Sequence, residues 1–324
     1  MKKFLLSLLT IAFAFSAQAV EKQVTSPDGK LVVTLSDENG VPTYAVAYEQ
    51  VSFIETSPIG LVTNIGDFSK QMSMGAEVQI KEVNENYQLA TIKKSNVNHH
   101  ATEAVVPFSQ NNKHIFDLIL RVTNNDVAFK YKLYPQGPTR SIIVKEEKTS
   151  FSLPEGTTTF LAPQVKPMGG FARTYPSYET PYAADEPTGR NGWGEGYTFP
   201  CLFRNADKGW VLISETGVNG AYVGSRLMGH EGSLYTIGFP QEGEMNGLGS
   251  TTPGLPLPGE TPWRTITLGT TLAPIVETTI AFDLVEPRYE ASKEYIFGAG
   301  SWSWIIGMDN STKFDEQIRY IDFS

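Results

Sequence analysis

The segment LVVTLSDENGVPTYAVAY, residues 31–48, is the clearest indicator of fold class in this 324-residue chain. On each side of the dipeptide Asn39-Gly40, apolar side chains alternate with more polar neighbours. The apolar positions are Leu31, Val33 and Leu35 before the dipeptide and Tyr44, Val46 and Tyr48 after it. Period-two alternation is typical of a strand with one buried face, and Asn-Gly between two such runs is a strong hairpin signal. The segment therefore predicts an antiparallel β-hairpin.

The same alternation recurs through most of the chain. Clusters of Asp, Asn, Gly and Pro separate the later strand-like runs, which are Ile115 to Val122, Ala128 to Leu133, Phe160 to Val165, Val211 to Ser214, Leu234 to Phe239, Thr265 to Leu268 and Thr278 to Leu284. Helical periodicity is almost absent between residues 20 and 290, and we expect a regular helix only after Thr312. The pattern predicts one large antiparallel double sheet, bigger than an ordinary sandwich, with a long loop from Gly243 to Gly259.

The first 19 residues have the pattern of a secretory signal peptide. Lys2 and Lys3 form a basic start, an apolar run follows, and Ala17-Gln18-Ala19 matches an A-x-A cleavage site. The apolar run is too short to span a bilayer, which argues against a membrane anchor. We expect a chain that is secreted to the periplasm, begins near Val20 after cleavage and has no membrane partner.

Composition argues against several classes of site and partner. A formal charge of −9 at pH 7, without a cluster of Lys or Arg, argues against nucleic acid. Four His, none in H-x-x-H spacing, argue against a zinc site. The single cysteine, Cys201, excludes a disulfide within the chain and is expected to be a small buried residue in an apolar run.

The end of the chain has a different pattern. Gly298 to Gly307 is interpreted as a buried strand entered through small residues. Thr312-Lys313-Phe314-Asp315 then resembles a helix-capping box, followed by apolar residues at helical spacing at Phe314, Ile318 and Ile321. A strand followed by a helix begins a β/α unit, and the chain ends inside this helix. We expect a truncated domain here, with its remainder downstream.

A series of short motifs resembles a known family. In chain order the motifs are Ser26-Pro27-Asp28-Gly29-Lys30, Pro42-Thr43-Tyr44, Ser57-Pro58-Ile59-Gly60, Phe129-Lys130-Tyr131-Lys132-Leu133-Tyr134-Pro135, Lys145-Glu146-Glu147 with Phe151, Tyr178-Glu179-Thr180-Pro181-Tyr182, Ile213-Ser214-Glu215, Ser225-Arg226-Leu227, Thr261-Pro262-Trp263-Arg264, Trp302-Ser303-Trp304 and Tyr320-Ile321-Asp322-Phe323. No motif is diagnostic alone, but their order and spacing together resemble glycoside hydrolase family 97.

The resemblance implies a three-part enzyme: a β-super-sandwich, a catalytic (β/α)₈ barrel and a C-terminal β-domain. On this basis residues 1–19 are the signal peptide, 20–292 the N-terminal β-sandwich, and 293–324 the first strand and partial helix of a truncated barrel. The resemblance also implies calcium-dependent cleavage of α-glycosidic bonds, by an inverting α-glucosidase or a retaining α-galactosidase.

One metal ligand is carried over from the resemblance. In the family, a Glu of the sandwich reaches the active site and ligates calcium, and Glu179 in Tyr178-Glu179-Thr180-Pro181-Tyr182 stands at the matching place. Calcium prefers hard oxygen ligands, which a loop carboxylate supplies, although Glu179 could equally be a solvated loop acid. The catalytic carboxylates of the family lie on later barrel strands, so no residue of this chain is assigned as acid, base or nucleophile.

Two tryptophans are candidate sugar-binding residues. Trp193 lies in a Gly-rich loop, Asn191-Gly192-Trp193-Gly194-Glu195-Gly196, and Trp304 opens the expected barrel strand. A loop Trp usually has a partner, and aromatic faces stack on sugars. A barrel strand must also fill its own core, so both roles stay open for Trp304.

Three further sites are interpreted as structural. Glu215 is predicted to be a buried structural carboxylate in preference to a substrate contact. Arg264 is predicted to pair with a carboxylate and to support the domain interface. Asn310-Ser311-Thr312 matches a glycosylation sequon, but at a helix start it is interpreted as a cap.

Together these features predict the N-terminal portion of a secreted α-glycosidase that acts on α-linked oligosaccharides. The alternatives are a non-catalytic carbohydrate-binding β-sandwich and an inactive gene fragment. The choice between glucose and galactose, and between inversion and retention, stays open because it depends on later barrel strands.

Overall fold

A computed structural model of the chain describes residues 21–89, 92–168, 183–190, 195–229, 232–286, 296, 298, 300 and 302–324. The chain divides into two compact units, with unit 1 ending at Val285 and unit 2 beginning at Glu286. Among the described residues, no helix has both the length and the apolar character that crossing a bilayer demands.

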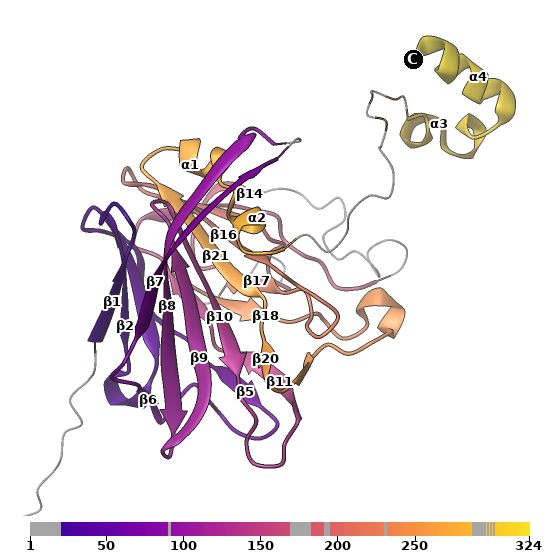
Figure 1. The fold of residues 1–324 in the computed structure, drawn as a ribbon. Helices are drawn as coiled ribbons and strands as arrows, with labels where there is room; N and C mark the ends of the chain where they lie inside the picture. Colours follow the sequence, from indigo (N-terminus) through magenta and orange to yellow (C-terminus); the bar gives the residue numbers. More distant parts are fainter. Residues whose placement is uncertain are drawn as a thin grey trace, which may run out of the picture. The chain divides into compact units, whose positions relative to one another are not determined.

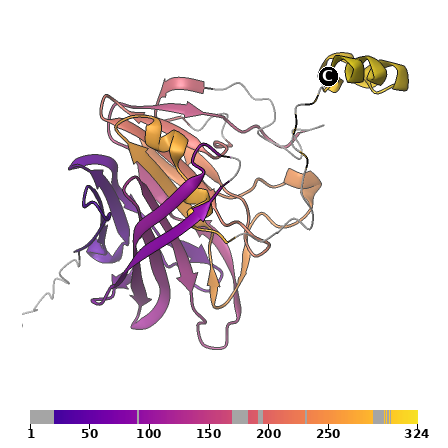
Figure 2. The same ribbon diagram turned by 45° about the horizontal axis from the view of Figure 1, so that its top comes forward.

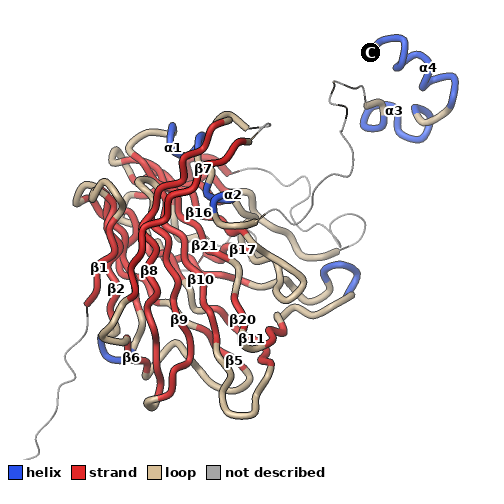
Figure 3. The backbone as a smooth tube through the Cα atoms, viewed as in Figure 1, coloured by secondary structure: helices blue, strands red, loops and turns tan. Residues whose placement is uncertain are grey.

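Unit 1 consists mainly of β-strands, as Figure 3 shows. The strands are β1 (Glu21–Thr25), β2 (Leu31–Ser36), β3 (Thr43–Tyr48), β4 (Val51–Pro58), β5 (Leu61–Thr63), β6 (Met72–Met74), β7 (Gln79–Gln88), β8 (Asn96–Gln110), β9 (Lys113–Val122), β10 (Asp126–Leu133), β11 (Ser141–Glu147), β12 (Ser150–Ser152), β13 (Thr157–Leu161), β14 (Ala183–Pro187), β15 (Cys201–Asn205), β16 (Gly209–Thr216), β17 (Arg226–Gly229), β18 (Leu234–Gly238), β19 (Gly254–Pro256), β20 (Gly259–Glu260) and β21 (Trp263–Gly269). The short helices are η1 (Glu38–Gly40), η3 (Glu244–Gly247), α1 (Ala273–Glu277) and α2 (Ile280–Asp283).

The strands form two large sheets and one small sheet (Figure 1). A 7-stranded sheet has the order β1-β2-β3-β4-β12-β18-β17. An 11-stranded sheet follows the path β14-β13-β15-β16-β21-β10-β9-β8-β6, with β20 paired to β10 and β7 paired to β8, and a 3-stranded sheet has the order β19-β11-β5. The described strand pairings are antiparallel. The predicted large antiparallel β-sandwich is confirmed.

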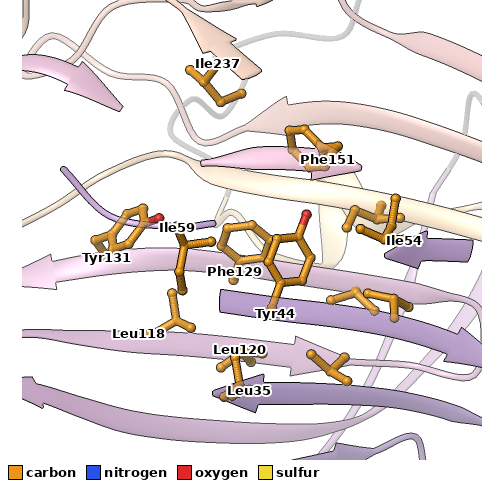
Figure 4. Packing of buried hydrophobic residues seen from close by; sticks show 14 of the residues in the cluster. Leu35, Tyr44, Ile54, Ile59, Leu118, Leu120, Phe129, Tyr131, Phe151 and Ile237 are labelled. Atoms are coloured by element: carbon orange, nitrogen blue, oxygen red, sulfur yellow. The ribbon is translucent and has the colours of Figure 1, made fainter. Parts of the chain in front are cut away.

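The main core lies between the two large sheets. Leu35 and Tyr44 of the 7-stranded sheet and Leu120 and Phe129 of the 11-stranded sheet belong to one buried cluster (Figure 4). The rings of Tyr44 and Phe129 lie with their centroids 5.1 Å apart. Cys201 belongs to the same cluster and is buried as a free thiol, as expected. Burial of one face explains the period-two pattern of strands such as β2 and β15, whereas β21 is buried on both faces.

The hairpin predicted over residues 31–48 is confirmed. β2 pairs with β3 in the register Leu31↔Tyr48 to Ser36↔Thr43. The connection contains η1, in which Asn39 and Gly40 adopt φ values of 55° and 74°. Asn and Gly tolerate this left-handed region better than other residues, so the dipeptide permits the chain to reverse here.

The strand expected over Thr278 to Leu284 is wrong, because this segment contains α2. An alternating strand would bury Ile280 and Phe282 on one face. The structure instead buries Ile280 and Asp283, while Phe282 is 47% exposed. Thr279 Oγ1 donates to Asp283 Oδ2 across one helical turn, at 3.0 Å. The buried residues Ile280 and Asp283 are three positions apart, which is the spacing of one face of a helix and not of a strand.

One further strand assignment and one loop assignment need smaller corrections. The run from Phe160 to Val165 is a strand only as far as Leu161, since Pro163 has no N–H to donate to a ladder. The expected loop from Gly243 to Gly259 contains the short strand β19, whose hydrogen-bonding partner β11 lies far away in sequence. Local composition does not reveal such a partner.

Unit 2 contains two helices, α3 (Trp304–Ser311) and α4 (Phe314–Phe323). The expected helix after Thr312 is confirmed, but the strand expected over Gly298 to Gly307 is wrong from Trp304 onward. A strand needs a neighbouring strand for its backbone hydrogen bonds, whereas a helix forms these bonds within itself. The described part of unit 2 contains no strand that could be such a neighbour. The expected cap is also wrong, because the N-cap residue is Lys313 and Thr312 Oγ1 donates to Asp309 O.

The buried cluster generates a stability prediction. We expect Leu120→Ala, at a residue 1% exposed, to lower the free energy of unfolding by about 2–5 kcal/mol, because the truncation leaves a cavity. The control, Ile80→Ala at a residue 60% exposed, should change it by less than about 0.5 kcal/mol. Urea unfolding followed by tryptophan fluorescence measures both values, and equal losses would contradict the assigned core.

Candidate functional site

Two of the three residues assigned to a site from the sequence, Glu179 and Trp193, lie outside the described residues. The third, Trp304, is the first residue of α3 and is 38% exposed. A barrel-strand position for Trp304 is therefore wrong, while its proposed sugar contact stays a prediction.

The described residues contain no cluster of acidic, histidine or cysteine side chains of the kind that commonly holds a metal ion. No group of three or more His, Cys, Asp or Glu side chains among them could hold a metal ion. The proposal that Glu179 ligates calcium therefore depends on the family resemblance alone.

The guanidinium of Arg264 in unit 1 is completely buried, at 0% exposed. Arg264 lies on β21, and its Nε and Nη2 donate to the two carboxylate oxygens of Glu147, at 2.8 and 2.6 Å. Its Nη1 donates to a carboxylate oxygen of Glu215 on β16 and to Ser225 Oγ, the latter at 2.8 Å. Two carboxylates therefore surround one fixed cation. Such bidentate contact is the strongest geometry available to an arginine.

Neighbouring residues satisfy the remaining polar atoms of this cluster. Tyr222 Oη donates to Glu147 Oε2 at 2.9 Å, and the backbone N–H of Ser225 donates to Glu215 Oε1 at 2.9 Å. Burial acts to lower the pKa of Arg264, but the charges of Glu147 and Glu215 outweigh it and raise that pKa. Burial raises the pKa of Tyr222, so its hydroxyl keeps the proton that it donates to Glu147.

This cluster has a structural role. Glycoside hydrolysis needs a carboxyl group that can give up or accept a proton or attack the sugar, and both carboxylates here are occupied by the arginine. The predicted pairing of Arg264 with a carboxylate is confirmed. Glu215, whose side chain is 13% exposed, is one of its two partners, and its predicted structural role stays a prediction. The arginine lies within unit 1, where it links β21 to β11 and β16. The sequence did not reveal Glu147 as its main partner, because 117 positions separate the two residues.

A second polar region surrounds α2 and includes a cavity of about 410 Å³. The cavity lies among α1, α2, β8 and the turn between β9 and β10. Asp126, His99 and Asp283 contribute to its wall, and each of them is at most 8% exposed. The sequence analysis did not identify this region, since its residues come from segments that lie far apart in the chain.

Comparison with known proteins identifies the family. A model of the glycosyl-hydrolase 97 N-terminal domain matches residues 24–287, which is most of the chain. The chain belongs to glycoside hydrolase family 97. The resemblance seen in the motif series is thereby confirmed.

Relatives in family 97 and solved structures extend this finding. A probable retaining α-galactosidase from Streptomyces bingchenggensis (strain BCW-1) is 28% identical over 294 residues, which cover 90% of this chain and 42% of that protein. The crystal structure of a β-arabinopyranosidase is 48% identical, with a TM-score of 0.87, and the match covers 93% of this chain and 48% of that one. The chain thus spans less than half the length of these relatives.

More distant structures share the fold. A family 97 enzyme from Pseudoalteromonas sp. strain K8 has been solved in complex with panose and with acarbose. The identities are 20% and 22% and the TM-scores 0.65 and 0.68, and each match covers 82% of this chain and 38% of the other.

The Arg264 cluster generates a second stability prediction. We expect Arg264→Met to lower the free energy of unfolding by about 3–5 kcal/mol, because Glu147 is left as an uncompensated buried charge. Arg204→Met is a matched control, since Arg204 pairs with Asp185 at the surface, with side chains 39% and 48% exposed. Its loss should stay below about 1 kcal/mol. Chemical unfolding of both variants measures the difference, and similar losses would contradict the role assigned to Arg264.

Proposed function

We propose that this chain is the N-terminal β-sandwich portion of a family 97 glycosidase that hydrolyses α-D-galactopyranosides or β-L-arabinopyranosides. The observation that carries the proposal is the 48% identity to a β-arabinopyranosidase over 93% of the chain. The 28% identity to a probable α-galactosidase agrees with it. Both sugars are pyranoses with the same hydroxyl orientations. Although their α and β descriptors differ, they have the same absolute configuration at the anomeric carbon, and arabinose lacks only the hydroxymethyl group of galactose.

In this proposal the sandwich supports catalysis without performing it. Hydrolysis needs two carboxyl groups placed across the glycosidic bond. Among the described residues, Glu147 and Glu215 are both paired with Arg264, and Asp126 and Asp283 both accept hydrogen bonds from neighbouring hydroxyl groups. We propose that the catalytic pair belongs to a barrel outside this chain, and that the sandwich packs on this barrel and contributes Glu179 as a calcium ligand.

The signal-like sequence of residues 1–19 supports secretion as part of the same proposal. A periplasmic enzyme would meet α-linked oligosaccharides from outside the cell. The complexes of the distant Pseudoalteromonas enzyme with panose and acarbose agree with an oligosaccharide as the general class of substrate.

Activity assays test the proposed division of labour. We expect the purified chain of 324 residues to release no aryl glycoside product, because it lacks the catalytic carboxyl pair. The full-length gene product should cleave 4-nitrophenyl β-L-arabinopyranoside or α-D-galactopyranoside at least tenfold faster, in kcat/KM, than the α-D-glucopyranoside. Turnover by the chain alone, or preference for the glucoside, would contradict the proposal.

A charge-removing substitution tests the calcium ligand. In the full-length protein, Glu179→Gln keeps the side-chain shape but removes its negative charge, so calcium should bind at least tenfold more weakly. Calorimetric titration of calcium into the chelator-treated protein measures the binding directly, and activity after recalcification should fall in parallel. Glu155→Gln, at an exposed turn residue, is the matched control and should change neither quantity. Unchanged calcium affinity in Glu179→Gln would remove Glu179 from the site.

A further inference from the structure

The last segment of unit 1, residues 270–285, forms a strap that contains α1 and α2. Figures 1 and 2 show both helices beside the hairpin of β7 and β8. The cavity of about 410 Å³ lies between the strap and the sheet. Pro274, Glu277 and Thr279 line it from the strap, and Asn98 and Asn125 line it from the sheet. Much of the strap therefore faces a polar space and not a packed core.

Apolar burial contributes little to holding the strap. Helix α1 buries none of its residues, and Val276 is 52% exposed. In α2, Ile280 packs against Ala128 and Trp263 in a small cluster separate from the main core. Apolar burial is the main source of local stability. The strap buries little apolar surface, so its local stability is lower than that of the strands beneath it.

Two buried carboxylates fasten the strap to the sheet, and the first is Asp126 at the start of β10. Its Oδ1 accepts hydrogen bonds from Thr278 of the strap at 2.8 Å and from Thr267 of β21 at 2.5 Å. Its Oδ2 accepts one from Thr123 at 2.8 Å. A single threonine hydroxyl thus connects the strap to this carboxylate.

The second carboxylate, Asp283, belongs to the strap and makes more contacts. Its Oδ1 accepts a hydrogen bond from Tyr87 Oη of β7 at 2.5 Å, and His99 Nδ1 of β8 lies 3.4 Å from its Oδ2. Its backbone carbonyl accepts from Arg121 Nη1 of β9 at 3.2 Å, and Glu103 holds the same arginine. Asp283 therefore joins the strap to three strands.

The charge on Asp283 strengthens these contacts. Burial acts to raise the pKa of this carboxyl, but the hydrogen bonds from His99 and Tyr87 outweigh burial and lower it. The carboxylate is therefore ionised at neutral pH, where charge-assisted hydrogen bonds are the strongest kind.

The closed position of the strap also has a cost. The side chain of His99 is 1% exposed, and its Nε2 has no hydrogen-bond partner in the structure. A buried polar atom without a partner is destabilising, and opening the strap would let water reach it.

We infer that the strap is a polar-latched element that opens as a unit while the sandwich stays folded, and that Asp283 is its latch. Unit 1 ends two residues after Asp283, at Val285. The latch thus holds the last turn of unit 1 against the sheet. This inference does not depend on the proposed glycosidase activity.

Hydrogen–deuterium exchange of the whole chain, read by mass spectrometry, tests the inference. Asp283→Asn keeps the side-chain shape but replaces an acceptor with an NH₂ group that faces the donors of its partners. We expect peptides from residues 276–285 to exchange at least tenfold faster than in the parent chain. Peptides from β9 and β10 should exchange at the parent rate, because the main core is unchanged.

A second variant and a control complete the test. Tyr87→Phe removes one donor to the latch and should accelerate strap exchange by about threefold. Glu277→Gln, in the strap but away from the latch contacts, should leave exchange unchanged. If Asp283→Asn does not fold, Tyr87→Phe with the same peptides decides the outcome. The inference is overturned if strap exchange is unchanged in the latch variants, or if the strands accelerate equally with the strap.

Discussion

The buried guanidinium of Arg264 needs acceptors for its hydrogen bonds and a compensating negative charge, and this requirement constrains the strands around it. Glu147 ends β11, Glu215 is a cross-strand partner of Arg264 on β16, and Phe129 is its partner on β10. A slip of one residue in either pairing would turn the arginine to the other face of the sheet. The unpaired buried charges would then destabilise the fold by more than any new contacts in the shifted register could stabilise it. The ion pair therefore specifies strand register more than it adds to net stability.

The sequence predicted those parts of the fold that depend on local pattern. Alternation along residues 31–48 and the Asn39-Gly40 turn were sufficient for the β2–β3 hairpin, because its two strands are neighbours in the chain. The same alternation identified several later strands that bury one face, such as β16 and β18. The motif series identified the family, which the match over residues 24–287 confirms.

The sequence did not predict features that depend on distant partners. The roles of Asp126, Glu147 and Asp283 depend on hydroxyl, imidazole or guanidinium groups that strands from elsewhere in the chain supply, and no local pattern marks these partners. Helix α2 was interpreted as a strand for this reason, because its buried face includes an aspartate. In unit 2, α3 forms where a strand was expected, since the described residues there provide no neighbouring strand.

The order of the 11-stranded sheet has a consequence for how the protein is made. β10 lies near the middle of that sheet, between β9 and β21, and β21 follows it by more than a third of the chain. At ribosomal speeds of about 5–20 residues per second, the growing polypeptide waits on the order of ten seconds for the strand that covers β10. During this interval the nascent sheet presents an open apolar edge, the feature that aggregation exploits and that holding chaperones bind. Synthesis, more than the finished sandwich, is therefore the stage at which this edge is exposed.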